Sequence, residues 1–322
     1  MEKKVNVFVS GASGVVGYGI LMTLESISCN RISSTIKQYS AANKFSEVFE
    51  LAPNTLSNDY QTWLENCLIR NKVSIAFPGI DVDMYWWSEN RELFRRNNTK
   101  VVLNNAELIN LCKDKWLFYQ KLKETDCSIF LIPTLLEGNY DQLRKELGCK
   151  LFMKPREGFG SKGASVIETE QDFIYCGGNE YEKNIIQSYV GDDDQEYTVA
   201  AFGDGMGGFF NIFSMKRALS KEGFTQECEV VNSDLFKDSV SKFCKVLKPV
   251  GPTNFQFRLA DNTPKLLEIN PRISSSSSIR AKFGYNESEM AIDFFLHGIA
   301  PKPCGMNSGK AIRYSEDVIF AP

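Results

Sequence analysis

Three oxygen-bearing side chains near the C-terminal end of the chain have the spacing of a magnesium site. Glu268 and Asn270 are one residue apart in an alternating strand, so both side chains project from the same face. Gln256 lies on the preceding strand, and a connection of odd length or a bulge brings it onto that face too. Mg²⁺ prefers oxygen ligands and keeps waters and substrate phosphates in its shell, so this set predicts a partial site completed by a nucleotide.

Two arginines follow this strand. Arg272 stands where the chain leaves the strand, and its planar guanidinium suits a phosphoryl group in transfer or a substrate carboxylate. Arg280 suits the same task for the acceptor substrate. A sheet edge with solvated polar residues explains each residue singly, and only the joint pattern favours a functional site.

Earlier segments offer positive charge and backbone donors to a polyphosphate. Lys115 and Lys154 each lie beside apolar residues, although most isolated lysines are simply solvated. The loop at 156–165 follows a short strand and is rich in glycine, so its N–H groups suit phosphate oxygens. The glycines concerned are Gly158, Gly160 and Gly163.

An apolar strand at 184–190 has the features of an adenine site. The backbone at Tyr189 or Val190 is placed to bind the base, and Gln187 to bind its exocyclic amine. Glu196 is then in reach of the ribose hydroxyls. The plainer interpretation is a buried strand followed by a charged loop at 192–194.

The N-terminal third alternates strands with helices, which predicts a parallel sheet covered on both faces. A strand at 5–9 is followed by Gly11, Gly14 and Gly17 and then by an apolar helix, the start of a Rossmann-like unit. A dinucleotide site also needs an acid about 20 residues further on. The first acidic residue in that region is Glu47, so the turn favours a structural role, or closure over another ligand, over NAD binding.

Parallel strands present their ligands at their C-terminal ends, which places the glycine turn, Gly79 and Asp81 at one crevice. Asp81 and Asp83 suit the cap of the following helix equally well. From Asn105 the pattern becomes helical. A strand at 151–155 and hairpins at 196–218 and 251–272 follow, the last with the polar connection 261–264.

The composition predicts a globular chain of two or three units. It has 322 residues, of which 43% are hydrophobic, and 37 Lys+Arg against 40 Asp+Glu leave a formal charge of −3. This balance argues against a basic nucleic-acid surface, and no apolar run reaches the roughly 20 residues of a membrane helix. We therefore expect a soluble, cytoplasmic protein with neither nucleic-acid nor membrane partners.

The cysteines and the histidine exclude several chemistries. Nine cysteines without close pairs predict reduced thiols rather than a zinc knuckle or a disulfide framework. His297 is the one histidine and ends an apolar helical pattern before Gly298, so a helix C-terminus explains it better than catalysis.

With the hairpin and its basic partners in view, the chain resembles the ATP-grasp enzymes, and among them the carbamoyl-phosphate synthetase large-subunit type. The strongest part is NFQF followed by LLEINPRISSSSS, where that family has Gln, then Glu-x-Asn-Pro-Arg, then a run with serine. The resemblance implies an α/β chain in which a Rossmann-like pre-ATP-grasp domain (1–112) precedes an ATP-grasp fold of two α+β lobes. These are a small lobe with a glycine-rich lid (113–190) and a large lobe with the metal-binding hairpin (191–322).

The family also implies roles for these residues. Gln256, Glu268 and Asn270 would bind one or two Mg²⁺, with Mn²⁺ as a substitute, and Lys115 would contact ATP phosphates. Arg272 and Lys154 would act on the transferring phosphate, while Gln187 and Glu196 fall at the adenine and ribose positions. Arg156, Glu157 and Lys162 depart from the commonest glycine loop. The acceptor pocket is expected at Ser274, Arg280, and Lys216 or Arg217.

The reaction that stand-alone relatives suggest is attack of a carboxylate on the γ-phosphate of ATP, followed by displacement of phosphate by an amine. This implies small-molecule carboxylate and amine substrates, and a homodimer is possible. Phosphorylation of bicarbonate or carbamate is an alternative. An NAD(P)-linked oxidoreductase is a second alternative that explains only the first tenth of the chain, and a nucleotide-binding regulator without turnover is a third.

Overall fold

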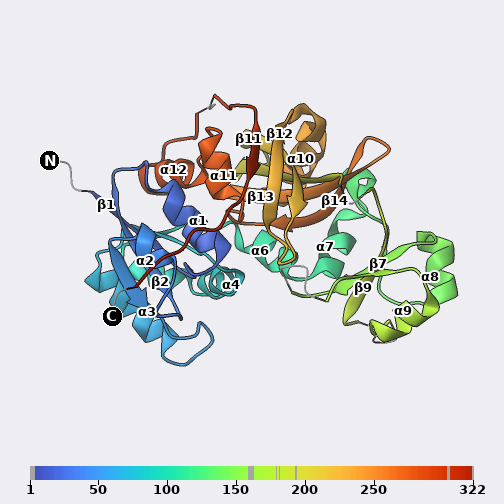
Figure 1. The fold of residues 1–322 in the computed structure, drawn as a ribbon, viewed down its shortest axis with the longest axis horizontal. Coiled ribbons are helices and arrows are strands. Elements are labelled where there is room, and N and C mark those ends of the chain that lie inside the picture. Colours follow the sequence, from blue (N-terminus) through green and yellow to red (C-terminus); the bar gives the residue numbers. More distant parts are fainter. Residues whose placement is uncertain are drawn as a thin grey trace.

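A computed structural model of the chain describes residues 4–158, 163–178, 180, 182–192, 194–302 and 305–320. Within these residues the strands form three sheets, and Figure 1 shows the three bodies one after another along the long axis. The boundaries 1–112, 113–190 and 191–322 remain a prediction.

The N-terminal body is a parallel sheet of order β3-β2-β1-β4-β5. Val7 and Val9 point into one core, with α1 and α2, and Phe8 points into the other, with α3, α4 and α5. Because both faces of the sheet are covered, consecutive residues of β1, Val7 to Val9, are all apolar and buried. The elements are β1 (Val5–Val9), α1 (Val15–Thr23), β2 (Cys29–Thr35), α2 (Ala42–Phe45), β3 (Val48–Leu51), α3 (Tyr60–Arg70), β4 (Ile75–Phe77), α4 (Asp81–Glu89), α5 (Arg91–Arg96) and β5 (Lys100–Val101).

The helical segment that follows is divided in two. Asp114 has extended backbone angles and separates α6 (Ala106–Lys113) from α7 (Lys115–Leu122). Its carboxylate accepts the backbone N–H groups of Trp116 at 2.9 Å and Leu117 at 3.0 Å, which caps α7. Leu122 and the residues around η1 (Ser128–Phe130) then pack into the core of the large sheet.

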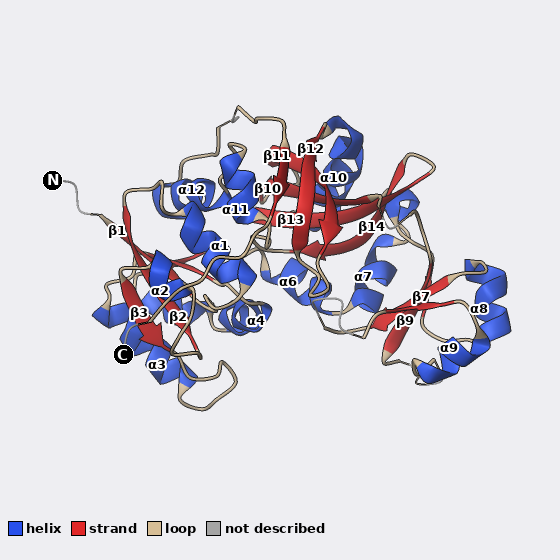
Figure 2. Ribbon diagram, in the orientation of Figure 1, coloured by secondary structure: helices blue, strands red, loops and turns tan. Residues whose placement is uncertain are grey.

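The small lobe is an antiparallel sheet of order β6-β9-β7-β8. Leu151 and Met153 of β7 pack against α8 and α9, which lie on the outer side of the sheet in Figure 2. Phe152 and Lys154 therefore face the opposite way, into a cleft. The elements are β6 (Thr134–Leu135), α8 (Tyr140–Leu147), β7 (Leu151–Pro155), β8 (Ser165–Ile167), α9 (Glu170–Tyr175) and β9 (Asn184–Ser188).

The large lobe is an antiparallel sheet of order β14-β13-β10-β11-β12-β15. One face packs on α10, and the other carries the cleft at one end and an apolar core shared with α1 at the other. The elements are β10 (Glu196–Asp204), β11 (Phe209–Leu219), β12 (Thr225–Val231), α10 (Asp234–Leu247), β13 (Val250–Ala260), β14 (Thr263–Asn270), α11 (Ser277–Lys282), α12 (Glu287–Ala291), η2 (Ile292–His297) and β15 (Lys310–Ile312).

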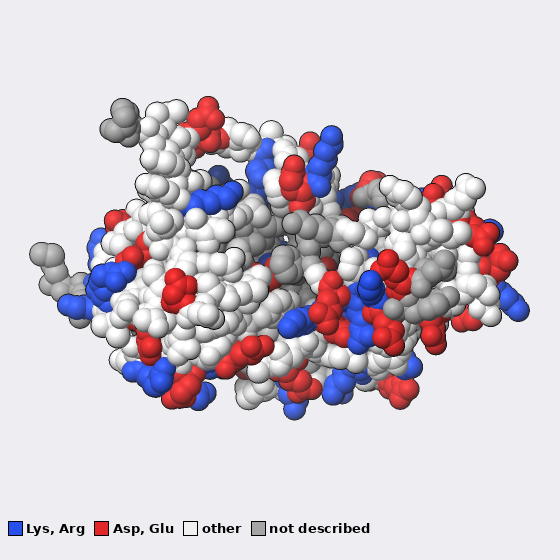
Figure 3. All heavy atoms as spheres, turned by 90° about the horizontal axis from the view of Figure 1, so that it is seen from below, with Lys and Arg blue, Asp and Glu red and all other residues white. Residues whose placement is uncertain are grey.

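Several smaller sequence predictions concern the cysteines, the histidine and the length of the helices. The described cysteines are all free, and η2 ends at His297, where Gly298 has φ +69°. No helix among the described residues has the length and apolar character to cross a membrane. Figure 3 shows acidic and basic side chains interspersed on the face that it draws.

Candidate functional site

The hairpin β13–β14 brings the proposed metal ligands onto one face. Its turn is Asp261-Asn262, both with positive φ (49° and 61°), as a two-residue hairpin requires. Gln256 pairs with Glu268 and Phe257 with Leu266, so Leu267 is an extra residue in β14. This bulge is the irregularity that the sequence required to place Gln256 beside Glu268 and Asn270. All three line a cleft of about 370 Å³ between the three bodies.

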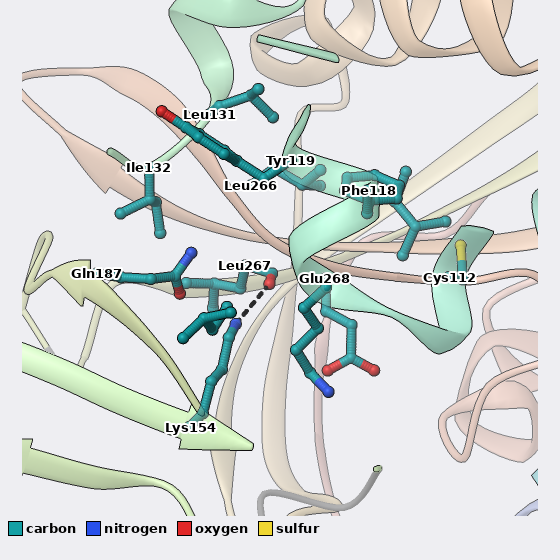
Figure 4. Close-up of a pocket in the computed structure, with 13 residues that line it drawn as sticks. Cys112, Phe118, Tyr119, Leu131, Ile132, Lys154, Gln187, Leu266, Leu267 and Glu268 are labelled. Atoms are coloured by element: carbon teal, nitrogen blue, oxygen red, sulfur yellow. Dashed lines mark hydrogen bonds between the residues drawn. The ribbon is translucent and has the colours of Figure 1, made fainter. Parts of the chain in front are cut away.

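Two lysines face Glu268 across the cleft, Lys154 buried and Lys115 half-buried. Lys154 Nζ donates to the carbonyl of the bulge residue, Leu267, at 3.1 Å, and Lys115 Nζ donates to Gly158 O at 2.9 Å. Figure 4 shows Lys154 and Gln187 on one side and Leu267 and Glu268 on the other. Burial lowers the pKa of Lys154 to about 8, opposed by Glu268 and reinforced by Lys115. Burial also lowers the pKa of Lys115. Both ammonium groups therefore lack sufficient negative charge around them.

The C-terminal end of β9 presents an orientated amide to the same cleft. Gln187 donates its Nε2 to Thr134 Oγ1 at 2.8 Å, which leaves its Oε1 as an acceptor. The N–H of Tyr189 donates to Lys150 O at 3.1 Å, so Val190 is the better candidate for a backbone donor to a base. Gln187 and Val190 both line the cleft.

Glu196 lines the cleft but is already paired. Its Oε1 accepts two donors from Arg217, Nη2 at 2.8 Å and Nε at 3.2 Å, and Arg258 Nη2 lies 3.7 Å from its Oε2. Arg217 lines the cleft as well, with its buried guanidinium paired with Glu196, and its contact with the acceptor stays a prediction. Lys216, on the other face of β11, pairs with Asp194 at 3.4 Å and does not line the cleft.

The N-terminal body reaches the site through Asp81, the first residue of α4. Asp81 Oδ1 lies 2.7 Å from Arg272 Nε and Oδ2 lies 3.1 Å from Nη2. Burial lowers the pKa of Arg272 and the pair with Asp81 raises it. The net result is a raised pKa. Asp83 instead points into the core, where it accepts from Thr55 at 2.6 Å and Tyr60 at 3.1 Å. Neither acid makes a side-chain cap for α4.

Arg280 is not in the cleft, which corrects the second arginine prediction. Its side chain is fully buried and pairs with Glu287 at 3.1 Å. Periodicity could not reveal this, because the partner lies in the next helix. Ser274 does line the cleft, with its Oγ accepting the N–H of Ser276 at 3.1 Å.

Two glycines of the glycine-rich loop have backbone angles that other residues rarely adopt. Gly158 and Gly163 have φ of 120° and 76°, and a Cβ on Gly163 would lie 2.9 Å from Pro155. Arg156 turns away to the carboxylate of Asp114, Nη2 to Oδ2 2.7 Å, so this unusual charge anchors the loop to α7. Gly160 and Lys162 lie outside the described residues.

The N-terminal glycine turn is explained by close packing. Gly11 has φ +57°, and a Cβ on Gly17 would lie 2.7 Å from both Ala12 Cα and Gly11 O. Helix α1 then packs on α11, and its Val15 and Val16 line the cleft. Gly11 and Gly17 are needed for this geometry whether or not the turn touches a ligand.

One residue of the site was missed from the sequence. Asn254 pairs with Asn270 across the hairpin and lines the cleft. It lies two residues before Gln256, so the same period of two that identified Glu268 and Asn270 would have found it.

Comparison with known proteins agrees with this geometry. Residues 112–276 match the family model of the ATP-grasp domain. The carbamoyl phosphate synthase large chain of Thermoplasma acidophilum is 24% identical over 235 residues, which are 66% of this chain and 22% of that protein. The chain thus spans about a fifth of the length of that relative.

Two solved structures share the fold. The biotin carboxylase domain dimer of Hydrogenobacter thermophilus 2-oxoglutarate carboxylase, in complex with MgADP, ADP and bicarbonate, has a TM-score of 0.75 and 11% identity over 96% of this chain and 74% of its own. The L-amino acid ligase of Bacillus licheniformis has a TM-score of 0.69 and 12% identity, over 92% and 75%.

Proposed function

This chain belongs to the ATP-grasp domain family, and on that premise we propose that it is an ADP-forming ligase that joins a carboxylate to an amine. The observation that carries the proposal is the cleft itself. It brings Glu268 and the amides of Gln256 and Asn270, from the hairpin, opposite Lys115 of α7 and Lys154 of β7. In this arrangement the lysines and the magnesium ion would together balance the negative charge of a bound triphosphate.

The hairpin fits a magnesium ion by the chemistry of its donors. One carboxylate and two amide oxygens on a single face are hard ligands, and their low total charge suits a metal that arrives with nucleotide phosphates. When bound, Mg²⁺ or Mn²⁺ would neutralise phosphate charge and orient the γ-phosphoryl group. We propose Gln256, Glu268 and Asn270 as the holders of one or two such ions.

We propose a nucleotide that runs along the cleft from β9 to β14. Gln187 Oε1 would accept the exocyclic amine of adenine, and the Val190 N–H would bind the ring. Glu196 would use its Oε2 for the ribose, because Arg217 occupies Oε1. Lys115, Lys154 and the N–H groups around Gly158 and Gly163 would then hold the phosphates.

The proposed chemistry has two steps. A carboxylate oxygen attacks the γ-phosphorus and the bond to the β-phosphate oxygen breaks, which gives an acylphosphate and ADP. An amine then attacks the acyl carbon, phosphate leaves and the amine loses a proton. In this chain the lysines and Arg272 would stabilise the charge that spreads over the phosphoryl oxygens. Water that would hydrolyse the acylphosphate has to be kept out, and the glycine-rich lid expected for this task stays a prediction from the sequence, since residues 159–162 lie outside the described ones.

Phosphorylation of bicarbonate is the second candidate. It is favoured by the likeness to a carbamoyl phosphate synthase and to a fold crystallised with bicarbonate. The same cleft would serve, with bicarbonate in place of the carboxylate. The oxidoreductase alternative has no comparable observation, since packing explains the glycine turn. That fold was also crystallised as a dimer, so a homodimer is part of the proposal, to be tested by light scattering.

The direct test is a product assay with pooled amino acids, bicarbonate and amines. The proposal expects ADP and phosphate to appear together and to depend on one carboxylate. AMP and pyrophosphate, or no nucleotide turnover across the whole pool, would overturn it. Melting temperatures measured with Mg·ATP and with NAD distinguish the ligase from the oxidoreductase. A ligand that binds the folded state raises the melting temperature, so the ligase is expected to be stabilised by Mg·ATP and the oxidoreductase by NAD.

A further inference from the structure

Asn254 lies on the metal-binding face, and its amide oxygen accepts two short hydrogen bonds from buried side chains. Its Oδ1 accepts from Arg280 Nη2 at 2.5 Å and from Thr198 Oγ1 at 2.7 Å. The residue is only 1% exposed, yet it lines the cleft beside Asn270. The bonds to Oδ1 come from residues that do not line the cleft, so the oxygen points away from it.

The chemistry of the partners fixes this orientation. A guanidinium can only donate, so it must meet the amide oxygen and not the amide nitrogen. Arg280 is itself held by Glu287, and the two side chains are 0% and 1% exposed. Rotating the Asn254 amide would place N–H groups against N–H groups in a buried site, which is strongly unfavourable. Its Nδ2 is therefore directed toward the cleft, where it meets no described residue.

Position along β13 indicates what the Nδ2 group meets. Arg258 stacks on Tyr189 at the proposed base end, with 5.4 Å between the guanidinium and the ring. Gln256 lies at the proposed metal, and Asn254 is one further step of about 6.6 Å along the strand. In this direction the cleft continues to Arg272 and Ser274, beyond the γ-phosphate. A substrate carboxylate must approach from that side to attack in line.

We propose that Asn254 is a substrate-binding residue that donates its Nδ2 hydrogens to an oxygen of the carboxylate substrate and of the acylphosphate formed from it. Arg280 and Glu287 are positioning residues that hold the amide in this orientation. The inference rests on the proposed function and deepens it. The three amides of this face would then have two different tasks. Gln256 and Asn270 would offer oxygen atoms to a metal ion, whereas Asn254 would donate hydrogen bonds to an anion.

The test uses Asn254→Asp in the full chain. Aspartate keeps the size of the side chain and can still accept from Arg280 and Thr198, but it presents an oxygen to the cleft where the amide presents N–H. The protein is saturated with Mg²⁺ and the non-hydrolysable nucleotide AMP-PNP. Bicarbonate and each of the twenty amino acids are then added separately, with the melting temperature as readout.

The expected result is a split between the two ligands. Wild type is stabilised by Mg·AMP-PNP and further by at least one carboxylate. The variant keeps the nucleotide shift and binds that carboxylate about 10- to 100-fold more weakly, the loss expected for a hydrogen bond to a charged group. Asn58→Asp, at an exposed loop position, is the matched control and retains both shifts. Arg280→Lys, which keeps the charge for Glu287, is expected to weaken carboxylate binding by a smaller factor.

Three outcomes would overturn the inference. The carboxylate shift persists unchanged in Asn254→Asp, or both shifts decrease together, or wild type is stabilised by the nucleotide and by none of the carboxylates. Failure of Mg·AMP-PNP to stabilise wild type is a separate result, and it rejects the proposed function itself. Should Asn254→Asp not fold, Asn254→Thr is measured in its place, since a hydroxyl can still accept from Arg280 but cannot supply the two amide hydrogens.

Discussion

Arg272, at the end of β14, is held by Asp81, at the start of α4, although 191 residues separate them in the chain. The two contacts of 2.7 and 3.1 Å are bidentate, and each side chain is 13% exposed. Nη1 of the same guanidinium donates to Ile273 O at 3.0 Å. Most N–H groups of Arg272 are therefore already hydrogen-bonded. Through Asp81, the N-terminal body fixes the orientation in which the guanidinium faces the cleft.

We expect Asp81→Asn to slow turnover while leaving nucleotide binding nearly unchanged. The guanidinium loses its charged partner and its fixed orientation, so kcat should decrease about tenfold or more. Loss of a partly buried charged pair should also lower the free energy of unfolding by about 1–3 kcal/mol. Glu65→Gln, which removes the more exposed pair with Arg96 in the same body, is the control. An Asp81→Asn enzyme with wild-type kcat would show that Arg272 needs no such support.

Glu268→Gln should abolish ADP release, by a factor of about 10³ or more, without unfolding the protein. The amide keeps the volume of the side chain but removes the one carboxylate that the hairpin offers to magnesium. Turnover is measured by ADP formation, and folding by circular dichroism. Glu289→Gln, on the exposed surface of α12, should behave as wild type. Unchanged turnover in Glu268→Gln would remove the proposed metal site.

Nucleotide affinity should weaken as the pH rises through about 8, the pKa to which burial lowers Lys154 from its ordinary 10.5. The lysine must be charged to hold phosphate, so Kd for Mg·AMP-PNP should rise by up to about tenfold per pH unit above that value. Lys154→Arg stays charged throughout and should lose this dependence. The same slope in both proteins would assign the titration to another group.

The stability of the free protein should move in the opposite direction over this range. Between about pH 8 and 10.5 the unfolded chain binds a proton at Lys154 that the folded chain does not, so the free energy of unfolding rises with pH. Below about pH 8 both states are protonated, and the cost of burying the charge is fully present. Denaturant titrations of wild type and Lys154→Met measure the difference, which should shrink as the pH increases.

Gly17→Ala should destabilise the protein by about 1–3 kcal/mol, because its Cβ would meet backbone atoms that cannot rotate away. Gly14→Ala should be tolerated, since its Cβ would lie 3.4 Å from Gly11 O, an ordinary contact. Thermal or urea unfolding distinguishes them. Equal losses in the two variants would mean that packing does not explain the glycine turn.

The local pattern of the sequence was sufficient to predict which side chains share one face of the hairpin β13–β14. Alternation placed Glu268 with Asn270, and Gln256 needed only the bulge that Leu267 provides. The same reasoning failed for Arg280, which is buried against an acid in another element, Glu287, and it did not foresee that Arg217 pairs with Glu196. A lone arginine in a sequence does not reveal whether its charge is committed. The Asp81–Arg272 pair was out of reach for the same reason, since it depends on how two bodies meet.

The measurement that tests the central claim most directly is calorimetric titration of ATP, with and without Mg²⁺, into wild type and Glu268→Gln. The account predicts that Mg²⁺ strengthens ATP binding at least tenfold in wild type and has little effect in the variant, because Glu268 is the carboxylate that would hold the ion. Equal enhancement by Mg²⁺ in both proteins, or no binding of Mg·ATP to wild type, would contradict it.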